Sequence, residues 1–132
     1  MEIVRQVFET FSEGVERGDY GGWFESAHVA EDLEWITPGV GLGTYRGRAA
    51  FLEFMAIWTE DSEAWSFELE RLIDAGDDRV VGLFLQTATG RASGVPVELH
   101  QGLVYELEGG RVIRIRNYFD PADALEAAGL SE

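Results

Sequence analysis

The stretch of sequence that decides the fold reads VPVELHQGLVYELEGGRVIRIRNYF, residues 95–119. On both sides of Gly109-Gly110, apolar and polar residues alternate with the period of a half-buried β-strand. A glycine pair between two such runs is typical of a two-residue hairpin turn. The stretch therefore predicts two long antiparallel strands, over about residues 95–107 and 111–119.

Three more strands are predicted before this hairpin. Aromatic and aliphatic residues alternate with polar ones from Trp65 onward, and a turn at residues 75–78 leads into an apolar run over 79–89. A short first strand is predicted over residues 32–37, where Leu33, Trp35 and Thr37 share one face. Pro38 is expected to end it. The second half of the chain is therefore expected to be a meander of four strands.

The remaining segments have helical periodicity. Apolar residues recur at helical spacing over residues 2–17 and 48–60, and a short helix is expected around Trp23 and Phe24. A terminal helix is predicted after Asp120, which would act as its N-cap, followed by a proline at the first helical position.

The order of these elements is α-α-β-α-β-β-β-β-α, within a single domain over residues 1–132. This order is typical of an α+β fold in which N-terminal helices wrap a curved antiparallel sheet.

Composition narrows the classes of function. The chain has 25 acidic and 10 basic residues, a formal net charge of −15, which makes nucleic acids and anionic membranes poor partners. It has no cysteine, and its two histidines are far apart, so no metal site is predicted. No apolar run approaches the ~20 residues of a membrane span, and the N-terminus does not read as a signal peptide. We therefore expect a cytoplasmic protein.

Four motifs, with their order and spacing, resemble the SnoaL-like proteins. They are YRGRAA (45–50), IDAGDDRVV (73–81), GGRVIRIRNYFD (109–120) and ALEAAGL (124–130). Those proteins belong to the nuclear transport factor 2-like superfamily, with ketosteroid isomerases and polyketide cyclases. The resemblance covers essentially the whole chain. It implies a cone-shaped sheet around one apolar pocket, commonly in a dimer.

The resemblance does not bring the catalytic residues of ketosteroid isomerases with it. Their general base corresponds to Thr37, their oxyanion-hole tyrosine to Phe11, and their protonated aspartate falls near Gly102. The acid-arginine-acid triad of limonene epoxide hydrolases has no evident match either, because the corresponding strand reads ELHQ, residues 98–101. Steroid isomerisation is therefore not expected.

The hairpin predicts which residues face a pocket. If the ladder runs unbroken from Glu108 opposite Arg111, then Gly102 lies opposite Asn117. One face then mixes apolar and polar residues as a ligand pocket requires, namely Glu98, His100, Gly102, Val104, Ile115, Asn117 and Phe119. A slip of one residue would exchange the two faces.

Three residues of this face are candidates for catalysis. His100 could transfer a proton near neutral pH, or it could be a structural histidine bonded across the sheet. Glu98 could orient His100, or it could simply be solvated. Asn117 could donate a hydrogen bond to a substrate carbonyl or enolate, or it could satisfy neighbouring backbone.

Other residues are expected to form the pocket wall. The predicted ligand-binding residues are Trp35, Thr37, Tyr45, Val104, Ile115 and Phe119, with core packing as the alternative for Trp35. Residues 39–43 are interpreted as a flexible rim of the pocket. For His28, an exposed or capping position is expected rather than catalysis.

These observations predict a cofactor-independent enzyme that acts on a small apolar carbonyl compound by proton abstraction, cyclisation or isomerisation. The alternative is a protein of the same fold that binds a small molecule without catalysis. A third possibility is a scaffold whose pocket is filled by its own side chains. We also expect a homodimer through the opposite sheet face, with an apolar patch of Leu103, Tyr105, Val112 and Tyr118 around Arg114 and Arg116.

Overall fold

The computed structural model describes residues 2–17, 23, 28–37, 43–60 and 62–130. The elements confirm the predicted α+β class and are α1 (Glu2–Arg17), β1 (Val29–Ile36), β2 (Thr44–Arg46), α2 (Gly47–Trp58), β3 (Ser62–Gly76), β4 (Arg79–Gly90), β5 (Pro96–Glu108), β6 (Arg111–Tyr118) and α3 (Pro121–Ala127). The short helix predicted around Trp23 and Phe24 falls on a stretch in which only Trp23 is described.

The six strands form one curved sheet in the order β2-β1-β6-β5-β4-β3. Every neighbouring pair is antiparallel except β1 and β6, which are parallel, so the sheet is mixed rather than wholly antiparallel as expected. A parallel pair needs a long connection, and here the chain between β1 and β6 supplies it. Strand β2 was not predicted, because three residues are too short to show an alternation.

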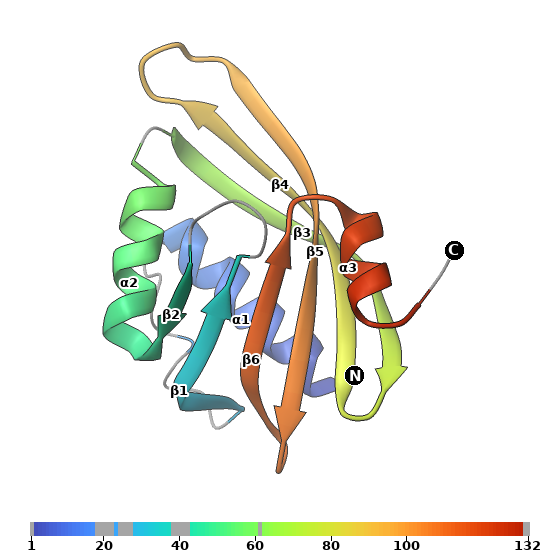
Figure 1. Cartoon of the computed structure of the whole chain (residues 1–132). Helices are drawn as coiled ribbons and strands as arrows, with labels where there is room; N and C mark the ends of the chain where they lie inside the picture. The colour runs from blue at the N-terminus through green and yellow to red at the C-terminus, as the bar shows by residue number, and fades with distance from the viewer. Residues whose placement is uncertain (1, 18–22, 24–27, 38–42, 61, 131–132) are drawn as a thin grey trace.

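Helices cover the two faces of this sheet unequally (Figure 1). The larger core lies between the sheet and α1 and α2, and it includes Phe8 from α1 and Phe51 from α2. A smaller cluster lies on the opposite face, where Ala124 and Leu125 of α3 pack against Val104 of β5. The face toward α1 and α2 is called the inner face below, and the face toward α3 the outer face. None of the described helices is long and apolar enough to span a membrane.

Two local predictions, one of a turn and one of a helix N-cap, are confirmed. The turn between β3 and β4 is formed by Asp77 and Asp78, which both have positive φ, as a tight hairpin turn requires. At the start of α3, the side chain of Asp120 accepts a hydrogen bond of 2.9 Å from the backbone N–H of Ala122, so it is the N-cap.

Glycine at position 102 lets α3 approach the outer face closely. A Cβ at this position would collide with the Cβ of Ala124 and would also touch Leu83. The prediction that Gly102 lies on the pocket face is therefore wrong, because this residue lies under α3 on the outer face.

Gly102→Ala should therefore destabilise the protein by about 1–3 kcal/mol, since the added methyl group has no room. Ala124→Gly removes the atom that it would strike, at a cost of about 1 kcal/mol for glycine in a helix. Urea unfolding of both single variants and of the double variant measures the coupling. The double variant should be more stable than the two single costs predict, and strict additivity would contradict this packing.

Candidate functional site

A small cavity lies between the inner face of the sheet and the helices α1 and α2. Most of its wall consists of aromatic rings, with two aliphatic side chains, and these residues are Phe8, Phe11, Trp35, Phe54, Met55, Phe67, Phe84 and Leu103. The rings of Phe8 and Phe84 meet edge to face at 5.6 Å between centroids. The open space is about 20 Å³, which is enough for one water-sized group.

Three amide side chains make up the polar part of the wall. Gln86 of β4, Gln101 of β5 and Asn117 of β6 are all buried and line the cavity. Nε2 of Gln101 donates a hydrogen bond of 3.3 Å to Oδ1 of Asn117. Adjacent strands thus bring neutral donors and acceptors together at one side of an aromatic cavity.

Two polar atoms of cavity-lining residues are buried without a hydrogen-bond partner. They are Nε1 of Trp35, which can only donate, and Oε1 of Gln101, which can only accept. Oγ1 of Thr37, just after β1, is also buried without a hydrogen-bond partner. A buried polar group without a partner costs about 1–3 kcal/mol, so a molecule that satisfies these atoms gains free energy on binding.

The lining residues that the structure describes include none with an ionisable side chain. Tyr105 lies in the same core, and its burial raises the pKa of its phenol far above the ordinary value of 10, so it stays neutral. The described residues also bring no three His, Asp or Glu side chains together as metal ligands. The site can hydrogen-bond and enclose a ligand, but its described walls hold no proton acceptor of the usual kind.

The predicted arrangement of β5 and β6 is wrong by one residue because β6 contains a bulge. The ladder begins as expected with Glu108 opposite Arg111, but it then skips Ile113. Beyond the bulge, Leu103 lies opposite Asn117, whereas the unbroken ladder placed Gly102 there. The extra residue moves Asn117 to the face of Gln101 and away from the face of His100.

His100 and Glu98 therefore lie outside the cavity. The side chain of His100 is 59% exposed, and its Nδ1 lies 3.0 Å from Oε1 of Glu70 on β3. Glu98 is exposed on the same face of β5, opposite Thr87. The expectation that His100 and Asn117 form the polar pair of the pocket is thus corrected, because Gln101 is the partner of Asn117.

The structure places the other predicted wall residues as follows. Trp35 lines the cavity, Thr37 is buried beyond it at the end of β1, and Ile115 lies in the same core. Tyr45 is half-buried, with its ring 5.2 Å from that of Phe54.

Two of the predicted wall residues and one other histidine lie elsewhere. Val104 is buried under α3 on the outer face, so its predicted place in the pocket wall is wrong. Phe119 is half-buried just after β6. His28 is half-buried before β1, where its carbonyl oxygen accepts a hydrogen bond of 2.8 Å from the N–H of Val112.

Gln101 and Gln86 were not predicted as pocket residues, although the sequence of β5 could have identified Gln101. Within β5, the odd positions from Leu99 to Leu107 hold apolar residues around Gln101, while the even positions include Glu98, His100, Glu106 and Glu108. That alternation alone assigns Gln101 to the buried face. The assumed register of the hairpin overrode it.

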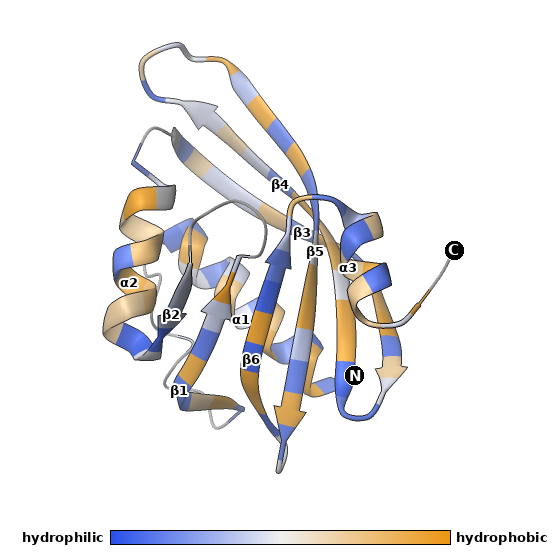
Figure 2. Ribbon diagram, viewed as in Figure 1, coloured by the Kyte–Doolittle hydropathy of each residue, from blue (hydrophilic) through white to orange (hydrophobic). Residues whose placement is uncertain are grey.

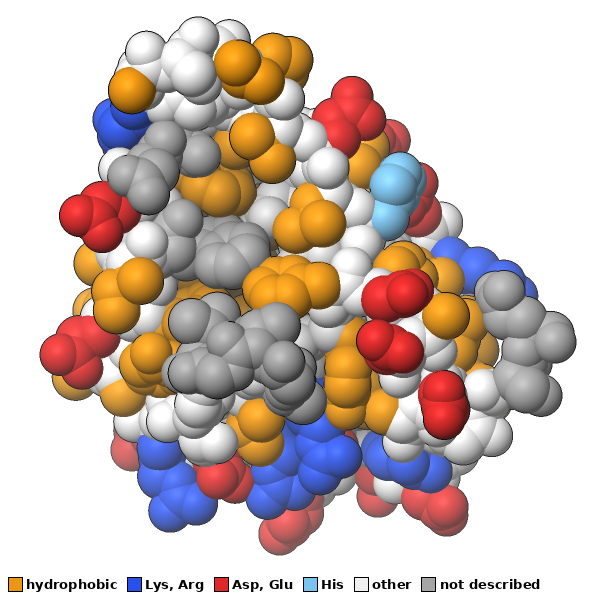
Figure 3. Space-filling model, turned by 45° about the horizontal axis from the view of Figure 1, so that its top comes forward, with side chains coloured by type: hydrophobic (Ala, Val, Ile, Leu, Met, Phe, Trp, Pro, Cys, Tyr) orange, Lys and Arg blue, Asp and Glu red, His pale blue; other side chains and the backbone are white. Residues whose placement is uncertain are grey.

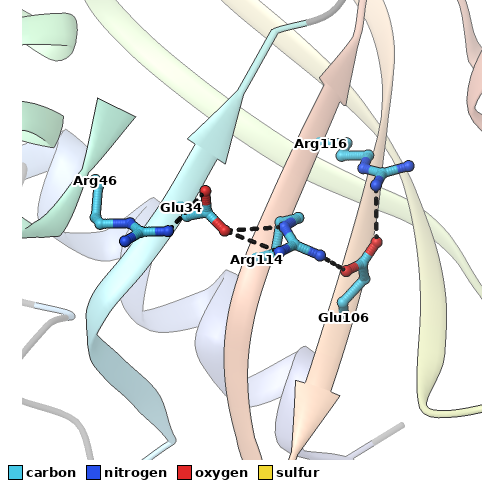
Figure 4. Close-up of polar contacts among 5 residues, drawn as sticks. All are labelled: Glu34, Arg46, Glu106, Arg114 and Arg116. Atoms are coloured by element: carbon cyan, nitrogen blue, oxygen red, sulfur yellow. Dashed lines mark hydrogen bonds and ion pairs between the residues drawn. The ribbon is translucent and has the colours of Figure 1, made fainter. Parts of the chain in front are cut away.

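The surface predicted as the dimer interface is also changed by the bulge. Leu103, Tyr105 and Val112 belong to the inner core instead of an exposed patch, and Tyr118 is half-buried beside α3. The outer face carries a row of ion pairs in their place (Figure 4). The apolar patch from which a homodimer was expected is therefore not present on this face.

This row joins four strands through alternating charges. Glu34 of β1 contacts Arg46 of β2 at 3.2 Å and Arg114 of β6 at 2.9 Å. Arg114 also bonds Glu106 of β5, which contacts Arg116 at 3.5 Å (Figure 4). The hydrogen bond from Arg114 lowers the pKa of Glu34, and the two glutamates raise the pKa of Arg114. The three arginines thus form ion pairs with glutamates of neighbouring strands.

Glu34→Gln should lower the free energy of unfolding by about 1 kcal/mol at neutral pH, since it removes a half-buried charge partner. The pKa of Glu34 is lower in the folded protein, so its contribution is present above 4.5, its ordinary value, and is lost as the pH falls through the lowered pKa. Urea unfolding over a pH series should show the two proteins converge in acid. Glu31→Gln, at an exposed position of the same strand, is the control. A difference between wild type and Glu34→Gln that is equal at every pH would contradict the ion-pair account.

Comparison with known proteins agrees with this architecture. The family model for the SnoaL-like domain matches residues 4–115. No curated protein matches the chain.

Several solved structures have the same fold. A nuclear transport factor 2-like protein of unknown function from Burkholderia pseudomallei has a TM-score of 0.73 at 24% identity, over 96% of this chain and 97% of its own. A protein of ketosteroid isomerase-like fold from Catenulispora acidiphila, solved with trimethylamine, has a TM-score of 0.67 at 15% identity, over 94% and 92%. TerC, co-crystallised with polyporic acid, has a TM-score of 0.73 at 22% identity, over 96% and 98%.

At these identities the solved structures establish the fold alone, whereas the family model covers most of the chain. With its helices, mixed sheet and aromatic-walled cavity now described, this chain belongs to the SnoaL-like domain family.

Proposed function

We propose that this protein binds a small neutral molecule, whose polar group enters the cavity and hydrogen-bonds Trp35 and Gln101. The observation that carries this proposal is a pair of unpartnered atoms, one donor and one acceptor, on two side chains that line the same cavity. A group that both accepts and donates, such as a primary amide, an alcohol or an enol, offers the partner that each of these two atoms lacks.

The chemistry of the wall favours a neutral ligand over a charged one. The described lining residues offer aromatic rings and amides but no counter-charge, and burying an unpaired charge is expensive. The net charge of −15 further disfavours anions. Structural neighbours support ligand binding by this fold, since one was solved with trimethylamine and another with polyporic acid.

A second candidate is the isomerase or cyclase acting on a carbonyl compound. The unpartnered N–H of Trp35 favours it, because such a donor can stabilise negative charge that develops on a carbonyl oxygen. Proton abstraction also needs a base, and none of the described lining residues supplies one. Binding without side-chain acid-base catalysis is therefore the function that the site supports best.

The test uses butyramide as a neutral probe and butyrate as its anionic counterpart. Butyramide should shift the NMR signals of the Trp35 indole N–H and of the side-chain amides of Gln101 and Asn117, while butyrate should not. Gln101→Leu should weaken butyramide binding about tenfold, the worth of one lost hydrogen bond, and should leave the protein folded.

His100→Leu is the matched control, because it makes the same kind of change on the other face of the same strand. It should leave the affinity for butyramide unchanged. If butyramide at millimolar concentration shifts none of the three signals, or if His100→Leu weakens binding and Gln101→Leu does not, the proposed site is wrong.

A further inference from the structure

The sheet extends well beyond the cavity, as a continuation of β3, β4 and β5. β6 has no pairing with β5 before Gly102, so residues 62–66, 87–90 and 95–100 project past the end of β6 (Figure 1). These three segments are called the extension. The ladder between β4 and β5 is unbroken from Arg79 opposite Glu106 to Thr89 opposite Pro96. Side chains of β4 and β5 therefore alternate regularly between the two faces of this part of the sheet.

The inner face of the extension continues the wall of the cavity without a break. Phe67, Gln86 and Leu99 lie side by side across the three strands, and the first two of them line the cavity. One step further out, Ala88 pairs with Val97. The ring of Trp65 is stacked on that of Phe67, with an interplanar angle of 13°. An apolar strip thus begins beside the cavity amides and leads outward.

The two faces of the extension differ sharply in polarity. On the inner face, Val97 is 40% exposed, and Val95 beyond it is 55% exposed. The outer face of the same strand carries Glu98 and His100. Figure 2 shows the alternation as orange and blue bands along β5, and Figure 3 shows apolar side chains over the extension and at its base. In an antiparallel sheet the apolar face commonly packs against another layer, whereas these two valines are exposed.

The size of the cavity requires that most of a ligand lie outside it. About 20 Å³ holds one water-sized group, so only the polar tip of a ligand fits. The apolar strip continues directly from the cavity wall at Phe67 and Gln86. At ~3.3 Å per residue, the strip from Gln101 to Val97 is about 13 Å long.

We infer that the ligand is a neutral amphiphile, whose head group occupies the cavity and whose alkyl chain lies along Leu99, Val97 and Trp65. This inference rests on the proposed binding function and specifies the class of its ligand. Contact between the chain and the strip removes apolar surface of both partners from water, so affinity increases with chain length.

The experiment measures the affinity of butyramide, hexanamide, octanamide and decanamide by calorimetry. Affinity should rise about twofold per methylene group, half of the free energy of full burial, because the strip covers one side of the chain. Val97→Ser should weaken the binding of octanamide several-fold and leave butyramide unchanged. Glu98→Ser, the neighbouring substitution on the outer face, should change neither.

Each outcome distinguishes the inference from the function on which it rests. If butyramide binds but longer amides bind no better, or if Val97→Ser has no effect on octanamide, the alkyl chain does not use the strip and only the inference fails. If no amide binds, the proposed function fails. Gln101→Leu should weaken every member of the series by the same factor. A loss limited to butyramide would show that the longer chains bind elsewhere and would overturn the inference.

Discussion

The arrangement of this molecule depends on one extra residue, Ile113, in β6. Because side chains alternate along a strand, a single inserted residue exchanges the faces of everything that follows it. The bulge lets Val112 and Ile115 both face the inner core, although three positions separate them. It also places Asn117 beside Gln101. Without it, Asn117 would face α3 and the charged residues.

The bulge separates two kinds of polar interaction that need different surroundings. Neutral amides can be buried at moderate cost when they bond each other, as Gln101 and Asn117 do. Charged groups cannot be buried without partners, and Arg114 lies on the outer face between Glu34 and Glu106. One face of β6 therefore contributes to a cavity, while the other holds the sheet together through ion pairs.

Local patterns in the sequence predicted the elements of the fold well. The alternation around Gly109-Gly110 and the Asp120 cap depend on neighbouring residues, and both are confirmed. The register of two paired strands depends on every residue between the turn and the pair in question. The bulge inside β6 therefore shifted the predicted site from Gln101 to His100. Trp35 and Asn117 were predicted to face the pocket and do so, but the register given for Asn117 was wrong. The size of the cavity could not be predicted, since it depends on how six aromatic rings pack.

Cross-strand contacts between Hα protons test the bulge most directly. In antiparallel strands, facing residues of non-hydrogen-bonded pairs have Cα atoms ~4.5 Å apart, which brings their Hα protons into contact. NMR spectra should show these contacts either for Leu103 with Asn117 and Tyr105 with Ile115, or for Gly102 with Tyr118 and Val104 with Arg116. Contacts of Gly102 with Asn117 or of Val104 with Ile115 would mean an unbroken ladder, and would contradict the account of the cavity.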